Sequence, residues 1–123
     1  MSDSRRKIGD WGEERAVEYL IKKGYSIKNK NVRNSYGEID IVARINNKTI
    51  FVEVKTRRNT SFGNPEDSVN IRKKIKLIES AVAYMQEHPE LGNDWQIDVI
   101  AIQTLNKDEF QVIHFENAVD DYE

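Results

Sequence analysis

Apolar and polar side chains alternate along two neighbouring segments, residues 38–45 and 49–56, and Asn46 and Asn47 lie between them. Side chains of a β-strand point alternately to opposite faces, so each segment predicts a strand with an apolar face. Asn46 and Asn47 tolerate the positive backbone angles of a two-residue turn. The two segments are therefore predicted to form an antiparallel hairpin, which strongly limits how the rest of the chain can fold.

A two-residue turn also predicts the register of this hairpin. Counting back from the turn places Asp40 directly opposite Glu53, and Lys55 then faces Glu38. The apolar side chains of both strands then share one face, and they are Ile39, Ile41, Ala43, Ile45, Ile50, Val52 and Val54. The charged side chains converge on the other face. Like charges opposite one another destabilise a sheet by up to about 1 kcal/mol when exposed, so the carboxylate pair needs compensation.

A hard divalent cation would compensate this pair. Mg²⁺ or Mn²⁺ accepts one or two protein carboxylates and keeps its other positions for water and phosphate oxygens. Lys55 is two residues beyond Glu53, on the same strand face, where an ammonium group can hold a water or stabilise charge on a phosphate. This chemistry fits phosphodiester hydrolysis. The alternative from the spacing is that Lys55 only pairs with Glu38 and Glu53 on a solvated sheet face.

The other segments predict two helices and three further strands. Residues 10–23 are typical of an amphipathic helix ended by Gly24, with Ala16, Val17, Leu20 and Ile21 at helical spacing. Strands are predicted over residues 25–32, 95–104 and 109–115. The resulting order of helix, three strands, helix and two strands predicts an α/β domain with one mixed sheet flanked by helices.

The second helix is the longer one in this prediction. Asn64 is expected to cap it, with Pro65 at its first position, and it is expected to run to about Glu87. Its apolar stripe is predicted to comprise Ile71, Ile75, Ile78, Val82 and Met85.

The composition indicates an ordinary globular domain. The 123 residues include no cysteine, which excludes disulfides, thiolate zinc sites and a cysteine nucleophile. No apolar run is long enough to span a membrane or to form a secretory signal, so a cytoplasmic protein is expected. We expect one domain over residues 1–116 and an acidic tail over residues 117–123. Because the tail has only acidic charges, the remainder is net positive, and its basic clusters either contact phosphates or are solvated.

Two stretches of the hairpin, Gly37 to Ala43 and Phe51 to Arg57, resemble the D-X(n)-E-X-K core of the PD-(D/E)XK nuclease superfamily. More narrowly, the chain resembles the bacterial YraN family, which is similar to archaeal Holliday junction resolvases. The resemblance covers about residues 9–102, and outside the hairpin it includes Gly9, Gly12, Glu13, Leu20, Gly24, Tyr25, Phe62, Gly63, Pro65, Lys73, Lys76, Asp98 and Val99. Ile39 replaces the proline that names the superfamily, and Gln96 stands where arginine is common.

This resemblance implies a restriction-endonuclease-like fold in which Asp40, Glu53 and Lys55 are catalytic. It also implies that Glu13 completes the acidic cluster, so that Asp40, Glu53 and Glu13 would hold Mg²⁺ or Mn²⁺. Glu13 lies on the apolar stripe of the first helix, where burying a carboxylate is unfavourable unless a specific interaction compensates it. The alternative is that Glu13, like Glu14, only interacts with the helix dipole. Gly9 and Gly12 either let the backbone approach the site or make the helix start flexible.

Several basic residues are candidates for contacts with nucleic-acid phosphates, namely Arg57, Lys73 and Lys76. Phe62 either stacks on an unpaired base or anchors the core, the latter being favoured. His88 and His114 lie far apart in sequence and are interpreted as structural.

The leading hypothesis is a Mg²⁺- or Mn²⁺-dependent endonuclease that hydrolyses DNA phosphodiester bonds. Specificity for branched DNA and a homodimer follow only from the resemblance to resolvases; no membrane partner is expected. One alternative is a nucleic-acid-binding protein that has the nuclease-like fold but does not cut. Another is a protein-interaction domain with a vestigial acidic cluster, which the intact set of Glu13, Asp40, Glu53 and Lys55 argues against.

Overall fold

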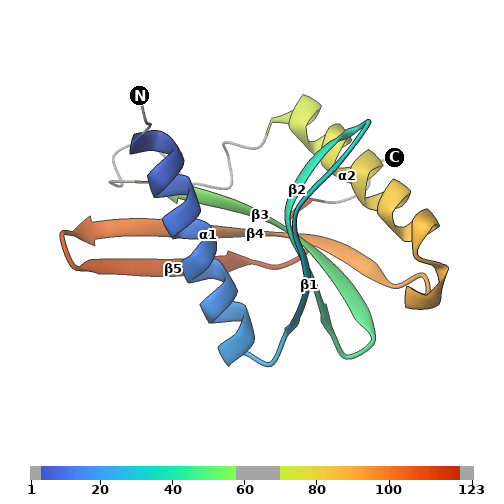
Figure 1. Cartoon of the computed structure of the whole chain (residues 1–123), viewed down its shortest axis with the longest axis horizontal. Helices are drawn as coiled ribbons and strands as arrows, with labels where there is room; N and C mark the ends of the chain where they lie inside the picture. The colour runs from blue at the N-terminus through green and yellow to red at the C-terminus, as the bar shows by residue number, and fades with distance from the viewer. Residues whose placement is uncertain (1–3, 58–69, 120–123) are drawn as a thin grey trace.

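The computed structural model describes residues 4–57 and 70–119 and has the predicted order of elements (Figure 1). Its elements are α1 (Ser4–Lys22), β1 (Ser26–Asn34), β2 (Gly37–Ile45), β3 (Lys48–Arg57), α2 (Ile71–Glu87), the short 3₁₀ helix η2 (Pro89–Leu91), β4 (Trp95–Asn106) and β5 (Glu109–Phe115). Helix, three strands, helix and two strands in one mixed sheet confirm the α/β fold predicted from the sequence.

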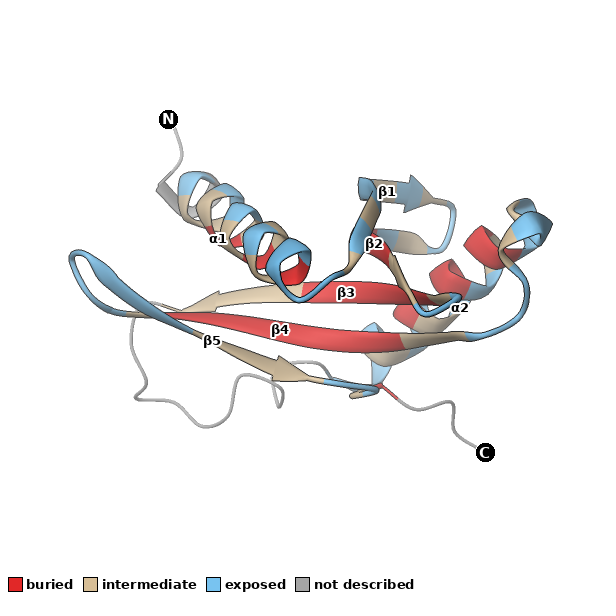
Figure 2. Cartoon of the chain, turned by 90° about the horizontal axis from the view of Figure 1, so that it is seen from below, coloured by how far each residue is buried: buried red, intermediate tan, exposed pale blue. Residues whose placement is uncertain are grey.

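The five strands lie in sequence order, β1-β2-β3-β4-β5. Only the central pair, β3 and β4, is parallel, and the other neighbours are antiparallel. A parallel pair needs a long crossover, and the segment that contains α2 supplies it. The two central strands are the most buried. Figure 2 shows that the middle of β3 and of β4 is buried, while the outer strands β1 and β5 are more exposed.

The sheet is covered on both faces. Ala16 and Leu20 of α1 belong to one buried cluster, and Leu77 and Tyr84 of α2 belong to another. Successive strand residues alternate between the two clusters: Ile50 and Val52 pack with α1, while Phe51 packs with α2. This alternation explains why the central strands are apolar at nearly every position.

The hairpin register is confirmed up to the pair Ile41–Val52. Asn46 and Asn47 have φ values of 50° and 64°, as the two-residue turn requires. Beyond this pair the regular backbone ladder ends, and the carboxylate of Asp40 accepts a hydrogen bond of 2.8 Å from the backbone N–H of Val54. The side chain of Asp40 therefore bonds to the partner strand where the next backbone pair would have formed.

The two faces of the hairpin differ from the prediction in three respects. Ile39 joins the cluster beneath α2, although the other predicted apolar residues pack in or against the cluster beneath α1. The opposite face is not only charged, because Val42 and Phe51 are buried there under α2. Glu38 pairs with Arg33 of β1 at 3.7 Å rather than with Lys55. The first two differences follow from α2, which buries a face that the hairpin pattern alone would leave to solvent, whereas the third reflects the pairing of β2 with β1.

Helix α1 begins at Ser4 rather than at residue 10. It ends at Lys22, one residue earlier than predicted, and Gly24 follows with a φ of 98°, in the left-handed region that favours glycine and ends a helix. Ala16 and Leu20 are fully buried, whereas Ile21 of the predicted stripe is 57% exposed.

Helix α2 corrects the prediction at its start and along its stripe. It begins at Ile71, and Asn70 caps it by accepting a hydrogen bond from the backbone N–H of Lys73; Asn64 and Pro65 lie outside the described residues. The side facing the sheet comprises Leu77, Ser80, Ala81, Tyr84 and Met85. Of the predicted stripe, Met85 is buried and Ile78 packs against the core, as expected, whereas Ile71, Ile75 and Val82 are exposed. Both sets have helical spacing, so periodicity alone does not select between them. No helix in the described part of the chain is both long and apolar enough to cross a membrane.

Candidate active site

A cluster of charged side chains forms where β2, β3 and the first turn of α2 meet. Alternation along β3 puts Glu53 and Lys55 on the face that α2 covers. Glu53 is only 4% exposed, and its Oε2 lies 3.2 Å from Nζ of Lys55 and 3.0 Å from Nζ of Lys73. A buried carboxylate is costly unless cations or hydrogen-bond donors surround it. Two ammonium groups from different elements therefore meet this requirement at a single oxygen.

Asp40 lies beside this group on the neighbouring strand. Burial, and then the negative charge of Glu53, raise the pKa of Asp40 from 3.8 to about 7, against the hydrogen bond from the N–H of Val54, which lowers it. Glu13 and Glu38 contribute further negative charge. A perturbed carboxyl next to a second carboxylate is typical of a functional site. At neutral pH such a group exchanges a proton readily, and a nearby cation would hold it ionised.

Glu13 approaches the cluster from α1. Burial raises its pKa, Asp10 adds to the rise, and a hydrogen bond from the side chain of Asn31 opposes it. The approach depends on Gly12, since a Cβ atom there would collide with Oγ1 of Thr56 on β3. Gly12 therefore allows close contact between α1 and the sheet, which was one of the two interpretations of the glycines near the start of this helix. An added Cβ at Gly9 would meet nothing within 4 Å.

The carboxylate oxygens of this cluster are the kind of ligand that a hard divalent cation prefers. Asp40 and Glu53 are a carboxylate pair of the kind that Mg²⁺ or Mn²⁺ accepts while keeping several waters. Across residues 4–57 and 70–119, no group of three or more histidine, cysteine, aspartate or glutamate side chains is arranged to hold a metal ion. The structure thus brings Asp40 and Glu53 together but does not gather Glu13 with them as a ready third ligand.

The predicted phosphate-contacting residues occupy three different environments. Lys73 contacts the cluster, where burial lowers its pKa, but the charge and hydrogen bond of Glu53 and the charges of Asp40 and Glu38 together raise it above its ordinary value. Lys76 is exposed one turn further along α2, near Gly37. Arg57 is half-buried at the end of β3, and its carbonyl accepts a hydrogen bond from the hydroxyl of Thr104. Phe62 and Gly63 lie outside the described residues.

The contact between Lys73 and Glu53 was not anticipated from the sequence. Lys73 is twenty positions away from Glu53, and no local pattern relates the two. The side-chain bond of Asn31 to Glu13 was missed as well. Asn31 has a φ of 52°, an unusual backbone angle that asparagine tolerates better than most residues. Asparagine is uncommon within strands, so its presence in this predicted strand was the sequence signal for an irregular backbone there.

A second polar network lies beneath α1. Asp98 is fully buried and accepts hydrogen bonds of 2.8 Å from the Gln96 amide and the Asn117 backbone N–H. Nε2 of His114 is 2.7 Å from Asp98, and its Nδ1 is 3.0 Å from the hydroxyl of Tyr19. Gln96, which stands where the resembled family often has arginine, thus bonds Asp98 directly. The network ties α1, β4 and β5 together, consistent with a structural His114.

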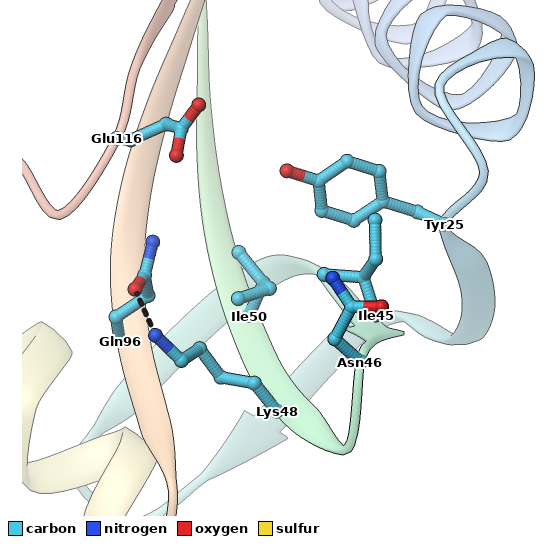
Figure 3. Close-up of a pocket in the computed structure, with 7 residues that line it drawn as sticks. All are labelled: Tyr25, Ile45, Asn46, Lys48, Ile50, Gln96 and Glu116. Atoms are coloured by element: carbon cyan, nitrogen blue, oxygen red, sulfur yellow. Dashed lines mark hydrogen bonds between the residues drawn. The ribbon is translucent and has the colours of Figure 1, made fainter.

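Next to this network is a cavity of about 330 Å³ at the start of β3 (Figure 3). Its lining comprises Tyr25, Ile45, Asn46, Lys48, Ile50, Gln96 and Glu116. Nζ of Lys48 donates to Oε1 of Gln96 at 3.1 Å, as the dashed line in Figure 3 marks. Because none of Asp40, Glu53 and Lys55 lines this cavity, it is separate from the charged cluster.

Comparison with known proteins relates most of this chain to one family. The family model described as "Uncharacterised protein family UPF0102" matches residues 12–102. A UPF0102 protein from Syntrophomonas wolfei is 44% identical over 97 residues, covering 79% of this chain and 84% of the relative. A UPF0102 protein from Alkaliphilus oremlandii is 41% identical and covers 92% and 97%, respectively. One from Syntrophotalea carbinolica is 40% identical and covers 98% and 97%.

Among solved structures, the chain is similar to SfsA of Pyrococcus furiosus in complex with Ca²⁺. The sequence identity is 16% and the TM-score is 0.41. The matched region covers 85% of this chain but 62% of that chain, which is less than two thirds of its length.

Proposed function

We propose that this chain, which belongs to the uncharacterised protein family UPF0102, is a Mg²⁺- or Mn²⁺-dependent endonuclease that hydrolyses DNA phosphodiester bonds. The observation that carries the proposal is the carboxylate pair of Asp40 and Glu53 on adjacent strands, with the ammonium group of Lys55 3.2 Å from Glu53. These are the residues that resemble the D-X(n)-E-X-K core of the PD-(D/E)XK nucleases. The sequence resemblance and the geometry of the cluster therefore point to the same residues.

Asp40 and Glu53 would hold the divalent cation. The backbone N–H of Val54 donates to Oδ2 of Asp40 and so fixes the orientation of this carboxylate relative to β3. Glu53 is held by its burial and by the two lysines, so neither carboxylate needs to find its position when a cation binds. When bound, the cation supplies Lewis acidity toward the phosphate and lowers the pKa of water. Glu13, whose pKa is raised by burial, would accept or hold a proton at the edge of the site.

Lys55 would stabilise the charge that develops on the phosphate. Its side chain is 18% exposed, so its ammonium group lies in a partly dry environment where electrostatic attraction is stronger than in water. Its place two residues from Glu53 ensures that the cation and the ammonium group act from the same face of β3. Arg57 and Lys76 flank the cluster and would bind neighbouring phosphates without reading the base sequence. A preference for branched DNA and a homodimer rest on the resemblance to Holliday junction resolvases.

The proposal is tested by incubating the protein with linear, forked and four-way DNA in the presence of Mg²⁺ or Mn²⁺. We expect the wild type to cut at least one of these substrates and EDTA to stop the reaction. Asp40→Asn and Glu53→Gln should lose cleavage by at least about 100-fold, because each removes one charged ligand. Glu14→Gln, which changes the exposed neighbour of Glu13, is the matched control and should cut like the wild type.

A second function, nucleic-acid binding without cutting, is favoured by one specific observation. Glu53 already contacts two ammonium groups, so its charge is compensated without any cation. If the wild type binds DNA but releases no product with either metal, and the two carboxylate variants bind equally well, this second function replaces the first.

A further inference from the structure

The first turn of α2 directs Lys73 at the charged cluster. Asn70 accepts a hydrogen bond of 2.9 Å from the backbone N–H of Lys73, and this cap sets where the helix begins. Nζ of Lys73 then lies 3.0 Å from Oε2 of Glu53. The side chain of Lys73 is 44% exposed, whereas that of Glu53 is only 5% exposed. Lys73 therefore extends from solvent to a buried carboxylate.

Lys73 and Lys55 share one oxygen atom of Glu53. With Asp40 ionised, Asp40 and Glu53 balance the two ammonium groups that contact Glu53, and Glu13 and Glu38 add negative charge from further away. A divalent cation that binds Glu53 would bring two more positive charges close to the two ammonium groups that already share Oε2, and like charges repel strongly at such short range in a partly buried space. One lysine must then move away from Glu53, unless a negatively charged phosphate enters at the same time.

Lys73 is the lysine that can move. The side chain of Lys55 is 18% exposed and is attached to the same strand as Glu53, so its position is restricted. Lys73 comes from a separate element and has a long flexible side chain with open solvent on one side. Its displacement therefore needs only rotation of side-chain bonds.

We infer that Lys73 is a second active-site lysine, which occupies Glu53 when the cation is absent and turns to the DNA phosphate when the cation displaces it. This inference rests on the proposed function and adds a role to it. The lysine compensates the acidic pair in the resting protein, and it then brings its charge to the substrate that the cation attracts. Lys73 and the divalent cation consequently compete for one carboxylate.

Mn²⁺ titration in a calorimeter without DNA tests this competition. Lys73→Met removes the competing charge and should bind Mn²⁺ about tenfold more tightly than the wild type. Lys73→Arg keeps the charge and should stay within about twofold of the wild type. Lys74→Met is the matched control, because it removes a charge from the adjacent position of the same helix, and it should also leave the affinity unchanged. Equal or weaker Mn²⁺ binding by Lys73→Met would overturn the inference.

A second measurement uses the unaltered protein, so it does not depend on the folding of a variant. Acetic anhydride acetylates exposed lysines, and mass spectrometry reports the rate at each lysine. Addition of Mg²⁺ should speed the acetylation of Lys73 by about threefold or more, since displacement from Glu53 exposes its amine, while Lys74 keeps its rate. An unchanged rate at Lys73 under saturating Mg²⁺ counts against displacement.

The two proposals fail in different ways. If the wild type binds neither Mn²⁺ nor Mg²⁺, both the proposed metal site and the proposed competition between Lys73 and the cation are wrong. If it binds Mn²⁺ and cuts DNA, but Lys73→Met has the affinity of the wild type and cuts as well as it does, only the role of Lys73 falls. If Lys73→Met binds Mn²⁺ more tightly and cuts DNA more slowly, both roles of Lys73 are supported.

Discussion

The carboxylate of Asp40 has two roles, one in the backbone geometry of the hairpin and one in the electrostatics of the site. Its carboxylate bonds the backbone of β3 where the ladder between β2 and β3 ends, and so it contributes to the local geometry of the hairpin. The same carboxylate has a pKa raised to about 7, because it is buried beside Glu53. An ionised Asp40 is therefore a cost to folding that the site retains, as expected where function requires a perturbed charge.

Replacing Asp40 by asparagine should stabilise the metal-free protein at alkaline pH. The folded pKa lies above the ordinary value of 3.8, so the cost of ionisation is absent below about pH 4, grows toward pH 7 and is constant above it. Asparagine can still accept the hydrogen bond from Val54. We expect Asp40→Asn to raise the free energy of unfolding by up to about 4 kcal/mol at pH 8 and to leave it nearly unchanged at pH 4.

Urea denaturation at the two pH values, with EDTA present, measures this difference. Glu14→Gln serves as the control, since its carboxylate is exposed and its loss should affect both pH values little. A variant of Asp40 that is no more stable than the wild type at pH 8 would show that its charge is better compensated than the structure indicates.

At the scale of a single element, α2 shows how two candidate stripes compete for the core. Leu77 is 3% exposed and packs with the sheet, whereas Ile75 is 41% exposed. Both are long aliphatic side chains at plausible helical positions. The helix is oriented with Leu77, Ala81 and Tyr84 facing the sheet. The same orientation brings the side chain of Lys73 to Glu53. Packing and site assembly are therefore set together.

Truncation of the two side chains should separate these stripes clearly. Leu77→Ala removes buried contacts and leaves a cavity, so it should lower the free energy of unfolding by about 2–4 kcal/mol. Ile75→Ala removes mainly solvent-exposed surface and should cost less than about 1 kcal/mol. Chemical denaturation of both variants at pH 7 provides the comparison. Equal losses would mean that α2 packs with a different side against the sheet.

For the whole molecule, the candidate site depends on how both helices dock on one sheet. Asp40 and Glu53 come from the sheet, Lys73 comes from α2, and Glu13 comes from α1. Figure 1 shows the two helices as separate elements joined through the strands between them. The site therefore exists only when the complete fold has formed. Close docking of α1 requires Gly12, which packs directly against Thr56.

Alanine substitutions at two glycines of α1 test this docking. A methyl group at Gly12 would collide with Thr56, so Gly12→Ala should lower the free energy of unfolding by about 1–3 kcal/mol. At Gly9 an added Cβ meets nothing within 4 Å, and Gly9→Ala should raise the free energy of unfolding by about 0.5–1 kcal/mol through better helix propensity. Thermal unfolding measures both. Similar effects at the two positions would contradict the close approach of α1 to β3.

The sequence by itself determined the features that depend on neighbours along the chain. Asn46 and Asn47 select a tight turn, and a tight turn selects the register of β2 against β3, so Asp40 and Glu53 were predictable as neighbours. Strand alternation likewise puts Lys55 on the face of Glu53. The order of helices and strands followed from periodicity and from the residues that end each element. All of these rest on local geometry, which a single sequence contains.

Only the tertiary structure decided the features that depend on which surfaces dock. The buried side of α2, the move of Ile39 to the cluster beneath that helix, and the contact of Lys73 with Glu53 all require knowledge of long-range packing. The pKa of Asp40 belongs here too, because burial is its largest cause. Periodicity identifies several apolar faces of similar quality, and the choice among them is made by how closely each one fits the sheet.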